Sequence, residues 1–156
     1  MAEARIDNDG FTFIEVFLKH RSKPTMYPQY FKVDSGANCT TISRRALSIL
    51  GYDDDWIKAG KRLEGNERPT VATGEAIDNC YLVILPEIHI GGCVGYNWPV
   101  RVSLNEKVQF RLLFGTDSMR FFNFEFDYEQ SVCRFRLIPG KRQLSFNQKE
   151  QSIHAV

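Results

Sequence analysis

Apolar and polar residues alternate over several short stretches of this 156-residue chain, which is the pattern of half-buried β-strands. The first stretch covers residues 11–18 and is rich in aromatic and β-branched residues. A polar segment with two prolines follows at 19–28, and a second strand pattern covers 30–33. Together they predict a β-hairpin that ends at Asp34.

More strand patterns follow a polar stretch at 53–68, and they predict a mostly β protein with one or two short helices. One helix is predicted over 43–51, with Ser43 as its N-cap and Gly51 where a left-handed cap would fall. A second short helix is predicted over 117–122. The further strands are expected at 71–73, 81–85, 87–90 (before a Gly-Gly turn), 100–104, 110–114, 124–128 and 132–137.

The length and the absence of repeats or linkers predict one folded domain, residues 11–138. We expect a loose N-terminal arm at 1–10 and a polar, mobile tail at 139–156. The first ten residues are polar and acidic, unlike a signal peptide, and the apolar runs are too short to span a bilayer. These features predict a cytoplasmic protein without membrane contacts.

Charge and composition exclude several classes of partner. The chain has 20 basic and 19 acidic residues spread along its length, so no basic stripe indicates nucleic acid. Four cysteines without a C-x-x-C pair and three scattered histidines indicate free thiols and no metal site. The phenylalanines at 121–126 are expected to be mostly core, and whether some face a second subunit stays open.

The turn after the first hairpin carries the candidate chemistry. Two carboxylates that share a proton can hydrolyse a peptide bond, since one accepts a proton from water while the other protonates the carbonyl oxygen. Asp34 can supply one of them. Ser35 could hydrogen-bond to a partner loop, the Gly36 N–H could reach the Asp34 carboxylate, and Ala37 leaves room for a substrate. The chain has one such motif, so the second carboxylate would come from a second copy. Taken alone, the tripeptide is more typical of an Asp-initiated turn.

The surrounding motifs strengthen the catalytic interpretation. An apolar strand precedes Asp34, and a short helix ending in Leu-Gly follows it. An Ile-x-Ile-Gly-Gly sequence lies at 88–92, and Leu-Phe-Gly precedes the last helix at 113–115. In this order the motifs, over about residues 11–138, resemble the retropepsin-like aspartic proteases, the bacterial and phage-like branches more than the retroviral one. The resemblance implies a closed, single-lobe β-barrel of the acid protease fold. It further implies a homodimeric endopeptidase that acts on proteins or peptides without a cofactor.

The resemblance also implies roles for individual residues. Asp34 would be the catalytic residue, supplied once by each subunit, with Ser35 in a hydrogen-bond lattice between subunits and Gly36 along the substrate channel. Residues 71–76 fall where the family has its flap, although an ordinary glycine turn is an equal alternative. The remaining implied positions are Ala72, Thr73, Gly74 and Glu75 as flap and substrate-binding residues, and Leu113, Phe114 and Gly115 as support behind the Asp34 loop.

The sequence departs from the retroviral pattern at two positions. Asn38 and Thr116 stand where retroviral enzymes often have a paired Asp and Arg, so both charges are missing together. We expect Asp117 to hydrogen-bond near Thr40 instead. Two rival hypotheses remain. One is a noncatalytic dimer that binds extended peptides by strand addition. The other is an unrelated β domain in which Asp34 only starts a turn.

Overall fold

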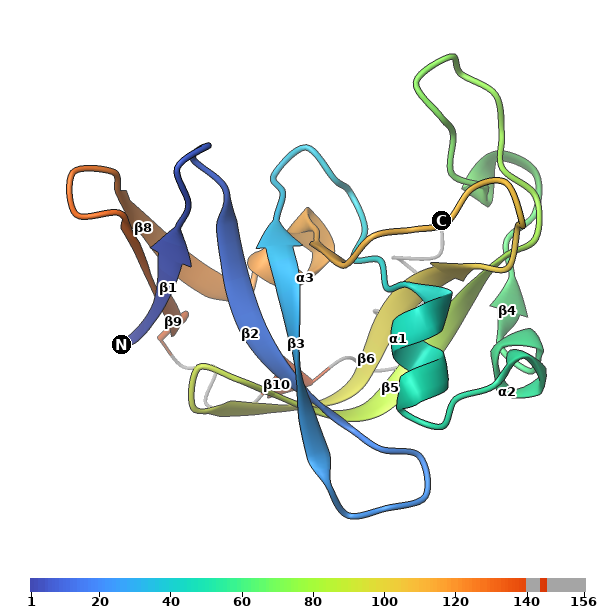
Figure 1. Ribbon diagram of the computed structural model, residues 1–156, viewed down its shortest axis with the longest axis horizontal. Coiled ribbons are helices and arrows are strands. Elements are labelled where there is room, and N and C mark those ends of the chain that lie inside the picture. Colours follow the sequence, from blue (N-terminus) through green and yellow to red (C-terminus); the bar gives the residue numbers. More distant parts are fainter. Residues whose placement is uncertain (140–143, 146–156) are drawn as a thin grey trace.

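The β2–β3 hairpin stands at the centre of the computed structural model, which describes residues 1–139 and 144–145 (Figure 1). The described elements, in chain order, are β1 (Ala2–Ile6), β2 (Thr12–Lys19), β3 (Met26–Val33), α1 (Arg44–Ile49), α2 (Asp54–Lys58), β4 (Lys61–Arg62), the 3-10 helix η1 (Gly65–Glu67), β5 (Cys80–Ile90), β6 (Cys93–Ser103), β7 (Leu113–Phe114), α3 (Thr116–Met119), β8 (Phe122–Asp127), β9 (Val132–Leu137) and β10 (Leu144–Ser145).

The described strands belong to one ten-stranded sheet with the order β10-β6-β5-β2-β1-β9-β8. β3 pairs with β2 on one side and with β7 on the other, and β4 pairs with β5. The pairings are antiparallel except for β3 with β7 and β10 with β6. The mostly β prediction is confirmed. The closed barrel is not, because the pairing of the described strands branches at β2 and does not close into a ring.

Local sequence signals correctly predict the hairpin and the helix after it. β2 and β3 pair over seven residues, from Phe13 opposite Lys32 to Lys19 opposite Met26. Helix α1 is shorter than predicted, but the Ser43 side chain accepts a hydrogen bond from the Ala46 N–H, as an N-cap does. Gly51 has a φ of +86°, so the left-handed cap predicted at this glycine is present.

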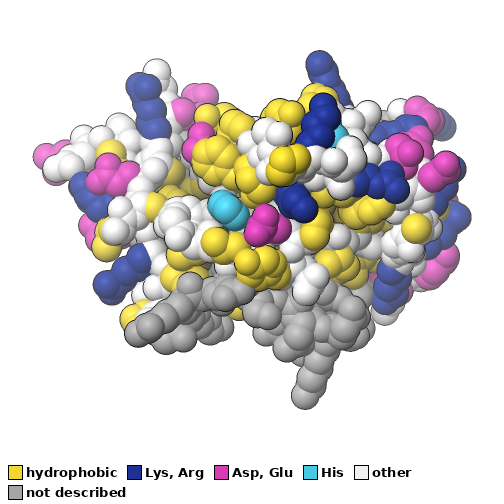
Figure 2. All heavy atoms as spheres, turned by 90° about the horizontal axis from the view of Figure 1, so that it is seen from below, with side chains coloured by type: hydrophobic (Ala, Val, Ile, Leu, Met, Phe, Trp, Pro, Cys, Tyr) yellow, Lys and Arg dark blue, Asp and Glu magenta, His cyan; other side chains and the backbone are white. Residues whose placement is uncertain are grey.

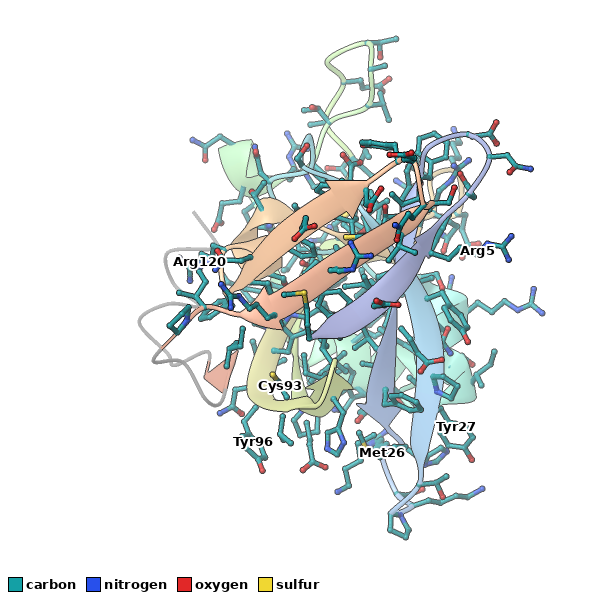
Figure 3. All side chains as sticks on the ribbon, turned by 90° about the vertical axis from the view of Figure 1, so that its left-hand side faces the viewer. Arg5, Met26, Tyr27, Cys93, Tyr96 and Arg120 are labelled. Atoms are coloured by element: carbon teal, nitrogen blue, oxygen red, sulfur yellow. The ribbon has the colours of Figure 1, made fainter. Side chains whose placement is uncertain are left out.

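The interpretation of residues 1–10 as a loose arm is wrong for most of the segment. Ala2–Ile6 is strand β1, which pairs with β9 over four residues and with the start of β2. Figure 3 shows β1 lying between β9 and β2 in the sheet. Its side chains alternate between partly buried and exposed until Ile6, which is buried. The strand forms because both of its edges find partners, which local propensity does not reveal.

Other expectations differ in detail. Residues 71–73 do not form a strand but begin a turn, and α2 lies within the stretch that appeared only polar. The strands predicted at 81–85 and 87–90 are one continuous strand, β5, and the one predicted at 110–114 is reduced to the two residues of β7. The tail predicted at 139–156 lies outside the described residues, apart from Pro139 and the backbone of β10.

A buried aromatic cluster fixes the strands that carry the Asp34 turn. Trp98 of β6 contacts Phe31 of β3 at 5.4 Å between ring centroids and Phe114 of β7 at 6.1 Å. Phe114 in turn contacts Phe122 of β8 at 6.2 Å. These rings are at most 6% exposed, so β3, β6, β7 and β8 share one core. Of the phenylalanines at 121–126, the first two are therefore core residues, while Phe126 is 41% exposed.

The two ends of the hairpin face opposite sides of the molecule. In Figure 1 the Asp34 turn and the β1–β2 turn point upward, whereas the β2–β3 loop points downward. The lower face mixes hydrophobic side chains with charges of both signs (Figure 2). In the part of the chain that the structure describes, no helix is long and apolar enough to cross a membrane.

Candidate active site

Asp34 follows β3 directly and begins a tight turn. Its N–H donates to the Phe114 carbonyl at 3.1 Å, and its own carbonyl accepts from the Ala37 N–H at 3.1 Å. The Gly36 N–H donates to Asp34 Oδ1 at 2.9 Å, as expected from the sequence. This bond orients the carboxylate within the turn. Asp34 is partly buried, while Ser35 and Gly36 are exposed and so can meet another molecule.

Gly115 passes immediately behind this turn. An added Cβ would lie 2.5 Å from the carbonyl carbon and oxygen of Cys39 and 2.9 Å from the Ala37 carbonyl oxygen. Those contacts are with backbone, which cannot rotate away as a flexible side chain would. Residues 113–115 thus lie behind the turn: β7 pairs with β3 next to it, and the glycine allows the close approach.

A buried hydrogen-bond network joins the turn to helix α3. Thr40 donates to Asp117 twice, from its N–H to Oδ2 at 3.1 Å and from its hydroxyl to Oδ1 at 2.7 Å. The Thr40 hydroxyl oxygen also accepts from the Gly115 N–H at 3.2 Å. Ser118 Oγ lies 2.6 Å from that hydroxyl and accepts from Trp98 Nε1 at 2.9 Å. The expected contact of Asp117 near Thr40 is confirmed. The roles of Trp98 and Ser118 were missed, because no local pattern marks residues that meet only in the folded chain.

A buried arginine lies on the other side of this network. Arg101 of β6 is 6% exposed, and its backbone N–H donates to the Thr40 carbonyl at 3.0 Å. Burial lowers the pKa of the Arg101 guanidinium, and attraction to Asp117 opposes that shift. The Asp117 carboxylate thus has three donors from Thr40 and Ser118 and a nearby cation, which offsets the free energy of burying its charge.

Thr40→Val is expected to lower the free energy of unfolding by about 2 kcal/mol, because the methyl group leaves the buried Gly115 N–H without its acceptor and removes one of the three donors to the Asp117 carboxylate. Denaturation in urea, followed by circular dichroism, measures the loss. The matched control is Thr73→Val at an exposed position, where a change within about 0.5 kcal/mol is expected. Equal stability of the two variants would contradict a structural role for the network.

The two positions that depart from the retroviral pattern lie together. The Thr116 N–H donates to the Ala37 carbonyl at 2.9 Å, and its hydroxyl lies 3.5 Å from the Asn38 carbonyl. A neutral contact therefore stands where the retroviral pattern has an ion pair.

The segment expected as a flap is a short exposed loop. Val71 and Glu75 are joined by a backbone hydrogen bond of 3.0 Å, and Thr70 bridges Ala76. Gly74 has a φ of +85° with nothing within 4 Å of an added Cβ. In Figure 1 this loop, between η1 and β5, projects upward like the Asp34 turn. Its backbone has few partners beyond the turn itself, which is compatible with either a flap or an ordinary glycine turn.

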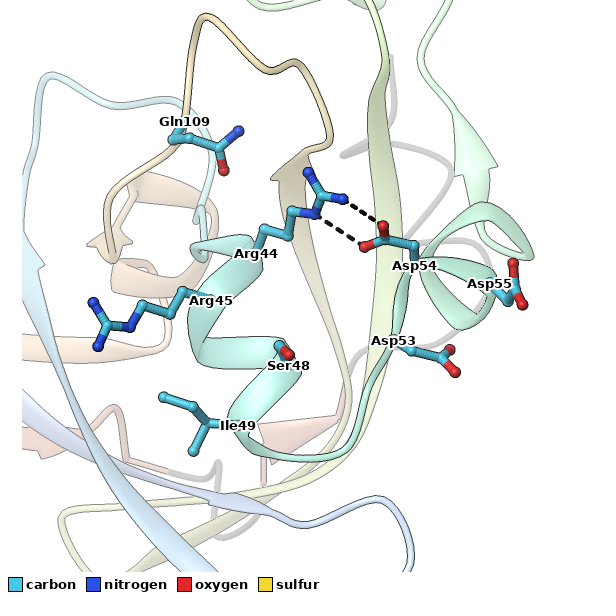
Figure 4. Close-up of a pocket in the computed structure, with 8 residues that line it drawn as sticks. All are labelled: Arg44, Arg45, Ser48, Ile49, Asp53, Asp54, Asp55 and Gln109. Carbon is cyan, nitrogen blue, oxygen red and sulfur yellow. Dashed lines mark hydrogen bonds and ion pairs between the residues drawn. The ribbon is translucent and has the colours of Figure 1, made fainter.

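A separate depression lies between α1 and α2 (Figure 4). Arg44 donates from Nε to Asp54 Oδ1 at 3.0 Å and pairs with a second Asp54 oxygen, and it contacts Glu106 at 3.2 Å. These hydrogen bonds raise the pKa of Arg44 and lower that of Asp54. The eight residues that line the depression do not include the Asp34 turn. Among the described residues, no three His, Cys, Asp or Glu side chains are grouped to hold a metal ion.

The β2–β3 hairpin thus ends in an Asp-Ser-Gly-Ala turn, and Gly115, just after β7, passes behind that turn. Among solved structures, the chain is similar to a retropepsin-like aspartic protease from Rickettsia conorii. The TM-score is 0.57 at 21% sequence identity, over 85% of this chain and 86% of that chain. This likeness shows that the chain has the retropepsin-like fold. No model of a known protein family matches the sequence, and no curated protein matches it.

Proposed function

We propose that this protein is an aspartic endopeptidase whose active site forms when two copies of the chain each contribute Asp34. The observation that supports the proposal is that Asp34 begins a tight turn directly after β3 in a chain with the retropepsin-like fold. Asp34 begins a turn that Gly115 approaches closely from behind, and the Gly115 N–H donates to the Thr40 hydroxyl, so backbone contacts support the turn.

The chemistry follows from pairing two such carboxylates. When they lie about 3 Å apart they cannot both ionise at low free energy, so the pair holds one proton. The ionised Asp34 accepts a proton from a water molecule as that water attacks the scissile carbonyl carbon. The protonated Asp34 of the other subunit donates to the carbonyl oxygen, and the tetrahedral intermediate then releases the amine.

The surroundings of Asp34 support further assignments within this proposal. The exposed Ser35 would bridge to the other subunit, and Gly36 and Ala37 would line the channel. The loop with Ala72, Thr73, Gly74 and Glu75 would close over a bound peptide, with Gly74 as the position that allows its backbone to change. The folded unit would be residues 11–138, to which β1 adds one further strand.

Mixing subunits tests whether both carboxylates are needed. When equal amounts of wild-type protein and Asp34→Asn are mixed and exchange subunits, about a quarter of the dimers carry two wild-type copies. We therefore expect the cleavage rate of a peptide to be about a quarter of the rate measured with wild type alone at the same total protein concentration. Sedimentation velocity shows whether dimers form.

In the control, buffer replaces the Asp34→Asn variant, so the wild-type protein is diluted but exchanges no subunits with the variant. A rate of about half, as expected for subunits that work singly, would contradict the paired mechanism. A protein that remains monomeric at high concentration and cleaves no peptide would contradict the proposed function itself.

A further inference from the structure

Lys32 lies two residues before Asp34, and its backbone is fixed on both sides. It is opposite Phe13 of β2 in the antiparallel pairing and next to Leu113 of β7 in the parallel pairing. A residue held by two neighbouring strands has little backbone freedom. The Lys32 backbone is therefore held at a fixed distance along the strand from Asp34, the candidate catalytic residue.

Lys32 and Asp34 project from the same face of β3. The parallel hydrogen-bond ladder with β7 continues as far as the Asp34 N–H, which donates to the Phe114 carbonyl at 3.1 Å. Successive residues of a strand point to opposite faces. Because Phe31 is fully buried in the core, the face shared by Lys32 and Asp34 is the one turned away from the core.

An aromatic ring contacts the ammonium group of Lys32. Nζ of Lys32 lies 3.7 Å from the centroid of the Phe11 ring, which is a cation–π contact. Because Phe13 is opposite Lys32, extending the same register places Phe11 opposite Asp34. The backbone of Phe11 is itself tied to Asp7, by two hydrogen bonds of 2.9 Å. Phe11 is 44% exposed and Lys32 is partly buried, so a ligand can reach the ring that carries the cation.

The neighbouring carboxylates do not neutralise this cation. In the described part of the chain Lys32 belongs to none of the ion pairs. A depression beside it is lined by acidic residues that have other partners: Glu15 accepts from Tyr30 at 2.8 Å, Glu3 pairs with Arg134 at 3.5 Å, and Asp7 accepts from Phe11. Arg5, opposite Phe13 on the other side of β2, also lines this depression, and the end of its side chain extends into solvent (Figure 3).

We propose that Lys32, seated on Phe11, is a specificity determinant that selects peptides with an acidic side chain next to the scissile bond. This inference rests on the proposed function. An acidic substrate side chain near the paired Asp34 residues would be repelled by their negative charge, and a fixed cation offsets that repulsion. A basic side chain at the same place would instead meet a like charge. The exposed face of Phe11 adds apolar contact with the methylene groups of a glutamate.

Peptides that differ only in Glu, Gln or Lys at one residue flanking the scissile bond test the proposal, with each flanking residue varied in turn. For wild type, kcat/KM is expected to be about tenfold higher for Glu than for Gln at one of these positions. Lys32→Met is expected to lose this preference, Lys32→Glu to favour the Lys peptide, and Lys32→Arg to retain the preference for Glu. Lys23→Met, at the far end of the same hairpin, removes an equal charge and is expected to behave as wild type.

A second measurement separates this inference from the proposed function. The dissociation constants of the same peptides are measured with Asp34→Asn, with and without Lys32→Met, so that no turnover is needed. If wild type cleaves with the same Glu-to-Gln ratio as Lys32→Met, the inference is wrong while the endopeptidase proposal stands. If wild type cleaves no peptide, the endopeptidase proposal fails, and the dissociation constants alone test whether Lys32 selects acidic peptides. Equal dissociation constants for Glu and Gln peptides would then overturn it.

Discussion

Asp34→Asn is expected to lower kcat/KM for peptide cleavage by about 10³-fold or more while the fold stays intact. Asparagine has nearly the shape of aspartate, and its oxygen can still accept the 2.9 Å hydrogen bond from the Gly36 N–H. The amide cannot take up the proton of an attacking water, nor can two amides share a proton. The variant thus removes the chemistry and leaves the turn. The measurement is the rate of cleavage of a broad peptide library at mildly acidic pH.

The matched control is Asp55→Asn, which makes the same change at an exposed position in α2 and is expected to cleave as wild type. Equal cleavage by wild type and Asp34→Asn would show that the mechanism is wrong. If neither cleaves but both bind extended peptides, the noncatalytic alternative gains support, since strand addition needs the groove and not the carboxylate.

Gly115→Ala is expected to lower the free energy of unfolding by about 3 kcal/mol and to lower kcat/KM more than tenfold. Gly115 has a φ of −85°, which any residue adopts, so the effect comes from contact alone. The new methyl group would lie 2.5 Å from the Cys39 backbone, and that backbone belongs to the loop that carries Asp34. Relief requires the loop to move, and a displacement near 1 Å can reduce catalysis about 10²-fold.

Gly74→Ala is the control for Gly115→Ala. Its methyl group would meet open space, so only the left-handed backbone at φ +85° opposes it, with an expected loss of about 1 kcal/mol. Urea denaturation of both variants gives the two values. If Gly115→Ala were as stable as Gly74→Ala, the loop behind Asp34 would have to be more adaptable than its backbone contacts indicate.

Several parts of the fold are encoded within a few residues. The β2–β3 hairpin follows from alternation on both sides of a proline-containing loop, and α1 follows from Ser43 and Gly51 at its ends. The Gly36 N–H reaches Asp34 because the two residues share one turn. In each case the partners lie close in sequence, so the pattern that predicts the structure also contains its contacts.

Two elements were missed although weak signals were present. β1 alternates Ala2, Ala4 and Ile6 with charged residues, but alanines carry little strand propensity, and pairing with β9 more than 120 residues away supplies its stability. α2 has Asp53 as its N-cap and one fully buried residue, Ile57. Five helical residues are too few to show a helical period, so tertiary packing decides their conformation.

By itself the sequence determined that one Asp-Ser-Gly-Ala turn ends a hairpin in a mostly β chain. Only the tertiary structure decided what surrounds that turn: the crossing of Gly115 behind it, the bonds from Thr40 to Asp117 across 77 positions, and the seating of Lys32 on Phe11. The physical reason is the separation in sequence between the residues that contact each other. Turns and caps are fixed by hydrogen bonds between near neighbours, whereas contacts between distant segments form only when the sheet assembles and brings them within reach.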